Sequence, residues 1–158
     1  MIKGLAHTGV CVPDVEAAVA WYRDVLGLAV LSPPYLMEGD ALRGDMGELV
    51  PDPRMKAAIV GFPDDGDRVL EVIEYPDVAG ESGTSRALTD HGLSHVALLC
   101  DDIDATRATL EARGVRFLVT GVADVARLRT TWFVDPWNVT FILIEKTRPQ
   151  RPYYAQWG

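Results

Sequence analysis

The alternation of apolar and polar residues divides the chain into two similar series of short elements. In the first series, period-two apolar runs predict strands at residues 4–12, 28–31, 56–62 and 68–75. A helix is predicted between the first two of these strands, from the apolar spacing of Val15, Ala18, Val19, Tyr22 and Leu26. The second series predicts strands at 93–100, 115–119, 127–134 and 139–145, with a helix at 103–113. Each series therefore has the order β-α-β-β-β.

The two series are copies of one unit. A shift of 88 residues brings His7 onto His95, Asp14 onto Asp102 and Val15 onto Ile103. In each copy an acidic residue suited to an N-cap opens the helix, and a glycine, Gly27 or Gly114, closes it. The pattern indicates an internal duplication that places two histidines at equivalent positions, near the start of the first strand of each copy.

The segments outside the copies have a different composition. Ser32-Pro33-Pro34 is predicted to stop the second strand. The insert 35–53 carries five carboxylates and three glycines, which is typical either of a surface excursion with a helical turn or of a lid over a pocket. We interpret the chain as one domain, 1–158, made of repeats 4–75 and 93–145, a linker 76–92 and a tail 146–158 whose aromatic residues pack against the protein.

Composition limits the classes of function. A net charge of −8 argues against a nucleic-acid partner, which requires clustered Lys and Arg. No apolar run approaches the roughly 20 residues of a membrane span, and the N-terminal residues do not resemble a signal peptide, so we expect a cytoplasmic protein without a membrane partner. Cys11 and Cys100 lie in apolar strands and are expected to be buried, reduced thiols.

Two β-α-β-β-β units side by side predict an α+β fold in which eight strands form a cupped mixed sheet. Strand alternation determines which residues line the inside of the cup. These residues are His7, Gly9 and Cys11 from the first unit, and His95, Ala97 and Leu99 from the second. The two histidines are thus expected on the concave face.

Three stretches resemble a known family. Residues 7–28, from His-Thr-Gly-Val to Val-Leu-Gly-Leu, closely resemble the opening strand and helix of the vicinal oxygen chelate superfamily. That superfamily contains glyoxalases, bleomycin resistance proteins and extradiol dioxygenases. Residues 93–102 and the sequence Phe-Val-Asp-Pro-Trp-Asn at 133–138 resemble its second repeat and final turn. The resemblance covers nearly all of residues 4–146 apart from the insert.

The resemblance implies a divalent metal ion. In metal-dependent members of the superfamily four strands each give one ligand, and His7, Glu71 and His95 match the first three. The fourth position falls on Ile142, which has no ligand atom, and Glu145 is expected on the opposite face of that strand. Two imidazoles and one carboxylate suit Fe, Mn, Ni, Co or Zn. Taken singly, each histidine could instead be a hydrogen-bonded core residue, and Glu71 a partner of His95 or of an arginine.

The function implied is that of a metal-dependent lyase or isomerase acting on a small oxygen-chelating substrate. Glu71 would take a proton next to a metal-polarised carbonyl. Ile142 removes the second base of a two-base epimerisation, unless the insert supplies one from Glu38, Asp40, Asp45 or Glu48. The residues expected to contact the substrate are Tyr35, Glu38, Trp132 and Ile142.

Two other functions remain open. A ligand- or drug-sequestering protein without chemistry would use the same cup as an aromatic-lined pocket. An extradiol-type dioxygenase also needs two histidines and a carboxylate, but in that branch the carboxylate comes from the last strand, where Ile142 lies. We expect a homodimer in every case, because a cupped sheet leaves strand edges that pairing would cover. The two repeats could pair within one chain or across the dimer.

Overall fold

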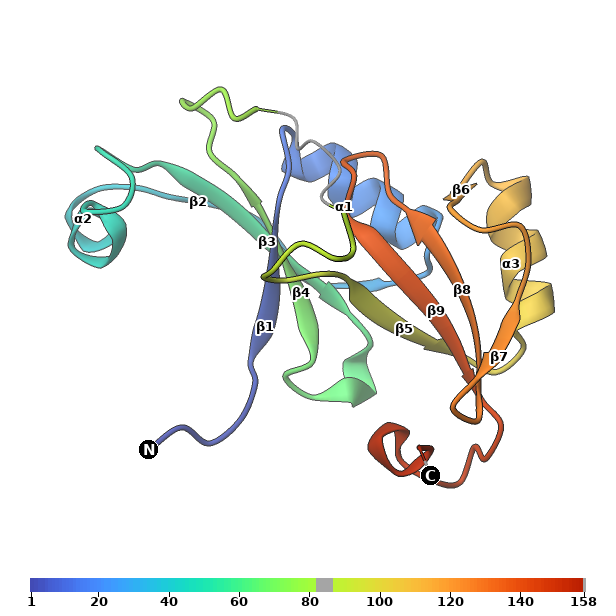
Figure 1. The fold of residues 1–158 in the computed structure, drawn as a ribbon. Helices are drawn as coiled ribbons and strands as arrows, with labels where there is room; N and C mark the ends of the chain where they lie inside the picture. The colour runs from blue at the N-terminus through green and yellow to red at the C-terminus, as the bar shows by residue number, and fades with distance from the viewer. Residues whose placement is uncertain (82–86, 158) are drawn as a thin grey trace. The chain divides into compact units, whose positions relative to one another are not determined.

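The computed structural model describes residues 1–81 and 87–157. The chain forms two compact units, residues 1–82 and 83–158. In the described part of the chain each unit contains one mixed β-sheet, and the long helix of each unit contacts the strands of its own sheet (Figure 1). The predicted α+β class is confirmed, and each repeat contains the β-α-β-β-β series, to which the first adds the short helix α2 and the second adds one strand. Residues 82–86 of the expected linker 76–92 lie outside the described residues.

The first unit follows the predicted order. Its elements are β1 (His7–Cys11), α1 (Val15–Asp24), β2 (Ala29–Met37), α2 (Asp40–Met46), β3 (Met55–Gly61), η1 (Pro63–Asp65) and β4 (Val69–Glu74). The sheet has the order β1-β4-β3-β2. β1 runs parallel to β4, and the other pairs are antiparallel.

Helix α1 covers one face of this sheet and leaves the other face without a helix of its own unit. Val15, Ala18 and Tyr22 are fully buried on α1, which contacts β2, β3 and β4. Val10 and Val72 lie on the helix-covered face and are also buried. Because alternate strand residues point to opposite faces, the side chains next to these valines point away from α1.

The second unit repeats this topology with one additional strand. Its elements are β5 (Val96–Cys100), α3 (Ile103–Ala112), β6 (Arg116–Phe117), β7 (Ala123–Val125), β8 (Leu128–Val134), β9 (Thr140–Lys146) and η2 (Tyr153–Ala155). The order β5-β9-β8-β6 matches that of the first sheet, and β5 runs parallel to β9. β7 was expected to be loop. It pairs with β8 through the tight turn Ala126-Arg127, in which both residues have positive φ angles of 51° and 61°.

The prediction that the second strand stops at Ser32-Pro33-Pro34 is wrong. β2 continues through both prolines to Met37, with shifts in its pairing with β3 between Val30 and Tyr35. β2 is an outer strand of its sheet, and Pro33 and Pro34 fall in the register shift between Ser32 and Tyr35, where neither is paired with β3. Residues 35–37 of the expected insert therefore belong to the sheet.

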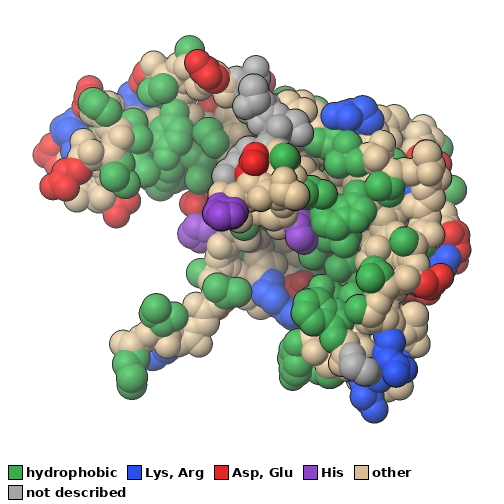
Figure 2. Space-filling model, in the orientation of Figure 1, with side chains coloured by type: hydrophobic (Ala, Val, Ile, Leu, Met, Phe, Trp, Pro, Cys, Tyr) green, Lys and Arg blue, Asp and Glu red, His purple; other side chains and the backbone are tan. Residues whose placement is uncertain are grey.

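The remainder of the insert holds the short helix α2. Gly39 precedes it with a φ of 87°, a left-handed conformation that glycine adopts without strain. Leu42 is the buried residue of α2, and Arg43 pairs with Asp40 and Asp52. Figure 2 shows the acidic side chains of this region gathered at the left of the view.

The tail and the cysteines complete the fold. Gln156 is fully buried, and its Nε2 donates to the carbonyl oxygens of Arg148 (2.8 Å) and Arg151 (3.0 Å), so the tail folds back on itself. The aromatic residues of the tail were expected to pack against the protein, but Tyr154 and Trp157 are exposed. The two cysteines are free, as expected, but Cys11 is exposed and Cys100 is only partly buried. None of the described helices has the length and apolar character needed to cross a membrane.

Candidate active site

His7 and Glu71 lie together on the face of the first sheet that α1 does not cover. The parallel pairing of β1 with β4 sets Gly9 opposite Glu71, so His7, two residues earlier, is the diagonal neighbour of Glu71 on the same face. The His7 Nε2 and the Glu71 Oε2 are 3.0 Å apart. The side chains are 48% and 21% exposed, so both keep access to solvent. Among the described residues Glu71 thus pairs with His7, and not with an arginine.

In the second unit, His95 immediately precedes β5 and is held from two sides. Its Nδ1 lies 2.9 Å from the Ser94 hydroxyl oxygen. Its ring meets that of Trp132 edge-on, with the centroids 4.9 Å apart and an interplanar angle of 76°. In the described part of the chain Nε2 has no hydrogen-bond partner, so it is the ring nitrogen that is open to a ligand.

Strand register places Ile142 at the position in the second sheet that Glu71 occupies in the first. Glu71 pairs with Gly9 on the parallel neighbour and with Ile59 on the antiparallel one. Ile142 pairs in the same way with Ala97 and with Trp132. Ile142 is only 8% exposed and packs with other apolar residues of its sheet, Leu128, Ile144 and Trp132. The duplicated position is therefore a polar one in the first unit and an apolar one in the second.

Glu145 lies on the helix side of its sheet, as strand alternation predicted. Its Oε2 accepts hydrogen bonds from the Ile103 backbone N–H (2.9 Å) and from Arg129 Nη1 (3.1 Å). Glu74, the equivalent residue of the first unit, accepts from the Val15 N–H at 2.9 Å in the same way. These two carboxylates cap the N-termini of α3 and α1, where the helix dipole favours negative charge.

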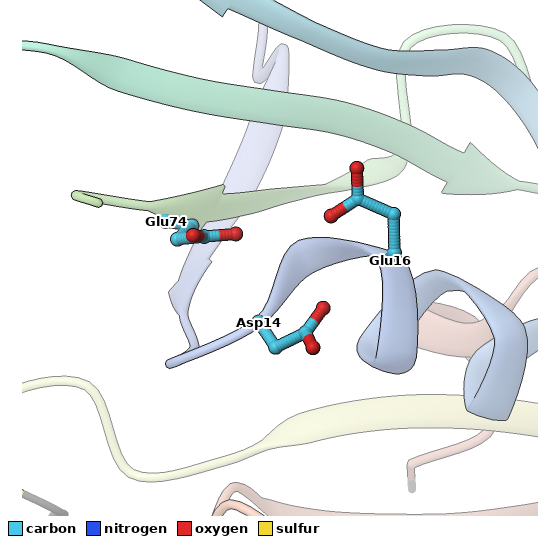
Figure 3. Close-up of side chains that lie close together, drawn as sticks. All are labelled: Asp14, Glu16 and Glu74. Atoms are coloured by element: carbon cyan, nitrogen blue, oxygen red, sulfur yellow. The ribbon is translucent and has the colours of Figure 1, made fainter.

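Three carboxylates near the start of α1 lie close enough together to suggest a cation site. The ligand atoms of Asp14, Glu16 and Glu74 are within 4.8 Å of one another (Figure 3). Each of them, however, already has a donor within the protein. Asp14 accepts from the Ala17 N–H at 2.9 Å, Glu74 accepts from the N–H of the first helical residue, and Glu16 pairs with Lys56.

The second unit contains the same arrangement. Asp102 caps α3 by accepting from the Ala105 N–H at 2.9 Å, and Arg129 pairs with Asp104 at 2.8 Å and with Glu145. The hydrogen bonds and ion pairs raise the pKa of the Arg129 guanidinium. The carboxylates at the start of α1 thus belong to a duplicated arrangement that caps a helix and pairs it with the neighbouring sheet.

The remaining residues expected to contact substrate have separate surroundings. Tyr35 is exposed on β2, opposite Ala57 of β3, and Trp132 lies on β8 against His95. Glu38 pairs with Arg54 at 2.9 Å, and Arg54 also binds Asp77 at 3.0 Å. Sequence reasoning missed this arginine, because its position relative to Glu38 depends on the pairing of β2 with β3. The charge of Glu38 is therefore already matched.

Comparison with known proteins identifies the family. The model of the Glyoxalase/Bleomycin resistance protein/Dioxygenase superfamily matches residues 4–143. The chain belongs to this superfamily. This confirms the resemblance found in the sequence.

Relatives within the glyoxalase superfamily cover almost the whole chain. The ethylmalonyl-CoA/methylmalonyl-CoA epimerase of Cereibacter sphaeroides is 28% identical over 147 residues, which are 92% of this chain and 97% of that protein. The uncharacterized protein YaeR of Escherichia coli is 27% identical over 145 residues, covering 92% and 98%. A glyoxalase family protein from Bacillus cereus has a similar structure, with a TM-score of 0.76 at 17% identity, covering 92% of this chain and 95% of the other.

Proposed function

We propose that the chain is a metal-dependent lyase or isomerase that removes a proton next to a carbonyl group of a small oxygen-chelating substrate. The observation that carries this proposal is the pairing of His7 Nε2 with Glu71 Oε2 at 3.0 Å on a sheet face that stays accessible to solvent. A similarity to the Cereibacter sphaeroides epimerase supports the class of reaction, since epimerisation next to a thioester carbonyl also begins with loss of a proton.

The donor set is compatible with a divalent cation. His7 and Glu71 already direct a nitrogen and an oxygen toward each other, and no lysine or arginine pairs with either of them in the described residues. His95 has Nδ1 occupied by Ser94 and Nε2 open, which is the arrangement of a metal-binding imidazole whose other nitrogen is held. We infer that these three residues hold Fe, Mn, Ni, Co or Zn, with the remaining coordination positions left to water and substrate.

When bound, the metal would polarise the substrate carbonyl and acidify the neighbouring C–H. Glu71 would accept the proton, since it is the carboxylate at this site. At the equivalent position of the second unit Ile142 can neither accept nor return a proton. The residues therefore favour a reaction with one base, in which the proton returns to the same face or a leaving group departs, over epimerisation by two opposed bases.

Hydrogen–deuterium exchange tests the proposal. The metal-loaded protein would be incubated in D₂O with methylmalonyl-CoA and with simple 2-hydroxy and 2-oxo acids, and loss of the substrate C–H signal followed by proton NMR. We expect exchange with at least one probe, and an exchange rate about 10²- to 10⁴-fold lower in Glu71→Gln. Asp64→Asn, which removes an exposed carboxylate of the same unit, is the matched control and should keep the wild-type rate.

An unchanged exchange rate in Glu71→Gln would refute the role of this carboxylate.

One observation favours the second candidate function, a ligand-sequestering protein. The face of the second sheet around Ile142 is apolar and carries Trp132, which suits a flat apolar ligand. Tight binding of such a ligand by protein that contains no metal and exchanges no probe would support sequestration instead.

A further inference from the structure

The charge of the chain is divided unevenly between its two units. Residues 1–82 contain 15 acidic and 6 basic residues, a net charge of −9, whereas residues 83–158 contain 8 acidic and 9 basic residues, a net charge of +1. The last 13 residues, 146–158, contain three cations and no acid. The net charge of the whole chain is thus negative, whereas residues 146–158 carry positively charged side chains.

Three arginines of the second unit lie close together, and none of them pairs with a carboxylate in the part of the chain that the structure describes. Arg148 and Arg151 belong to the tail, and Arg127 lies in the turn between β7 and β8. The carbonyl oxygen of Arg127 accepts a hydrogen bond from the Thr147 hydroxyl at 2.7 Å. Within residues 1–81 and 87–157 none of the three forms an ion pair, whereas Arg129 and Arg107 in the same unit do. Burial, together with the charges of Arg151 and Arg127, lowers the pKa of the Arg148 guanidinium. We call these three residues the arginine cluster.

Arg148 is the least satisfied member of the arginine cluster. Its Nη2 donates to the carbonyl oxygens of Ala155 and Gln156, but its Nε is buried and has no hydrogen-bond partner. A partly buried guanidinium is unfavourable when it has an unpaired donor and when its charged neighbours among the described residues are cations. A bound anion would offset the positive charge of the arginine cluster.

The backbone at Arg127 and Arg151 is held by hydrogen bonds that do not involve the side chains of these two arginines. Lys146 Nζ donates to the carbonyl oxygens of Pro149 (2.7 Å) and Arg151 (3.0 Å), and the buried Gln156 amide holds the same loop. The turn at Arg127 has positive φ angles at two non-glycine residues, a strained conformation that Thr147 stabilises. The backbone positions from which Arg127 and Arg151 project are therefore set before any ligand arrives.

Aromatic side chains with exposed faces border the arginine cluster. Tyr154 is 82% exposed and Trp157 is 62% exposed, and Trp157 meets Tyr153 edge-on with the centroids 6.0 Å apart. Figure 2 shows Lys and Arg side chains gathered at the lower right of the view, where Figure 1 places the C-terminal segment. Flat aromatic faces of this kind stack with nucleobases, and guanidinium groups bind phosphate through paired N–H donors.

We propose that Arg127, Arg148 and Arg151 bind the phosphate groups of a small nucleotide-like molecule, whose flat ring stacks on Tyr154 or Trp157. The ligand is small because a long polyanion would meet the net charge of −8 of the whole chain. The proposal stands apart from the metal chemistry, since it uses none of His7, Glu71 and His95. The site would serve a free nucleotide or the nucleotide portion of a larger substrate.

The test measures ADP binding to the full chain by calorimetry, with the change in total tryptophan fluorescence as a second readout. Arg127→Gln and Arg151→Gln remove charge while leaving the backbone carbonyls that hold the loop. We expect each to weaken ADP binding about tenfold or more, and we expect binding to weaken as salt is raised. Arg116→Gln is the matched control: Arg116 is an exposed arginine opposite Val134, at the far end of β8 from Arg127, and its loss should leave ADP affinity unchanged.

Further probes identify the ligand. Tyr154→Ala or Trp157→Ala should weaken ADP but spare pyrophosphate, and adenosine alone should not bind measurably. ADP compared with coenzyme A distinguishes a free nucleotide from a nucleotide attached to a substrate.

The proposal is overturned by absence of ADP binding to the wild type, by equal weakening in Arg116→Gln, or by an oligonucleotide binding more tightly than ADP. It is also overturned if the two variants change only the sedimentation of the protein, which would assign the arginine cluster to a contact between copies. Metal content should be unaffected in all of these variants, so failure here is distinguishable from failure of the proposed function.

Discussion

Glu71 and Ile142 occupy one position of a duplicated sheet, and the proposed chemistry depends on the difference between them. Glu71 offers a carboxylate to His7, whereas Ile142 lies against Trp132 and Ala97 in an apolar setting. Under the proposed function, a divalent cation would compensate the partly buried charge of Glu71, which is costly without a partner. The duplicated position thus holds a carboxylate in one unit and a packed apolar side chain in the other.

Replacing Ile142 by glutamate should restore a fourth ligand. We expect Ile142→Glu to tighten binding of a divalent cation about tenfold or more, and to lower stability by about 2–4 kcal/mol when no metal is present. Metal titration and thermal unfolding, each with and without metal, measure the two effects. Ile142→Gln is the control, since it should lose stability without gaining metal affinity. Equal metal affinity of the wild type and Ile142→Glu would remove Ile142 from the site.

Cys100 provides a prediction that depends on pH. Burial raises the pKa of the Cys100 thiol to about 11, and it also raises the pKa of Cys11. The thiolate is the reactive form, so alkylation by iodoacetamide should be slow at pH 8 and should accelerate as pH rises toward 11. The raised pKa also means that folding favours the neutral thiol, so the stability contributed by Cys100 is present below pH 9 and is lost as pH rises through about 11. Rapid alkylation of Cys100 at pH 8 would contradict this account.

Among the elements, α2 is the candidate for a lid. Leu42 is the buried residue of α2, and Arg43 pairs with Asp40 and Asp52 of the same segment. Arg54 and Glu38, which flank the segment, pair with each other at exposed positions. Exposed ion pairs contribute little to stability, typically about 0–1 kcal/mol each. The segment is thus held weakly enough to move.

Removal of residues 40–52 should spare the fold and weaken substrate binding. We expect the shortened protein, closed by a short glycine–serine linker, to keep its circular dichroism spectrum and to raise KM more than it lowers kcat in the exchange assay. Residues 35–37 must stay, because they belong to β2. Loss of cooperative unfolding in this variant would show that the segment is part of the core.

The elements also show what the sequence could and could not predict. Helix positions followed from apolar spacing and from Asp14 and Asp102, both of which cap their helices as expected. The passage of β2 through Pro33 and Pro34 was missed, because tolerance of proline depends on a strand being at the sheet edge, which is a tertiary property. That His7 and Glu71 lie near one another was expected from the resemblance, but their direct contact was not, because it requires the register of β1 against β4. Equivalence of Ile142 with Glu71, by contrast, follows from the repeat and is borne out by the register.

At the scale of the whole molecule, both sheets present outer strands. β1 and β2 bound the first sheet, and β5 and β6 bound the second within the described residues. Unpaired edges are sites for association with another chain, and closed two-fold assemblies are the commonest way in which proteins use them. We propose that the protein is a homodimer.

Light scattering during size exclusion tests the assembly. At micromolar concentration we expect a mass of twice 17.3 kDa. The mass should be the same in Arg127→Gln and Arg151→Gln, since the arginine cluster is assigned to a small ligand. A mass of one chain across the concentration range would contradict the proposed dimer.

The metal content of histidine variants tests the central claim, that His7, Glu71 and His95 hold one divalent cation. The protein would be loaded with Mn, Co, Ni or Zn, dialysed, and analysed by elemental mass spectrometry together with three variants. We expect about one metal ion per chain in the wild type and in His91→Ala, which removes the third histidine of the chain. We expect less than a tenth of that amount in His7→Ala and in His95→Ala, and release of metal from the wild type on acidification to about pH 5, because imidazole ligands must be deprotonated. Metal content that persists in His95→Ala would contradict the claim.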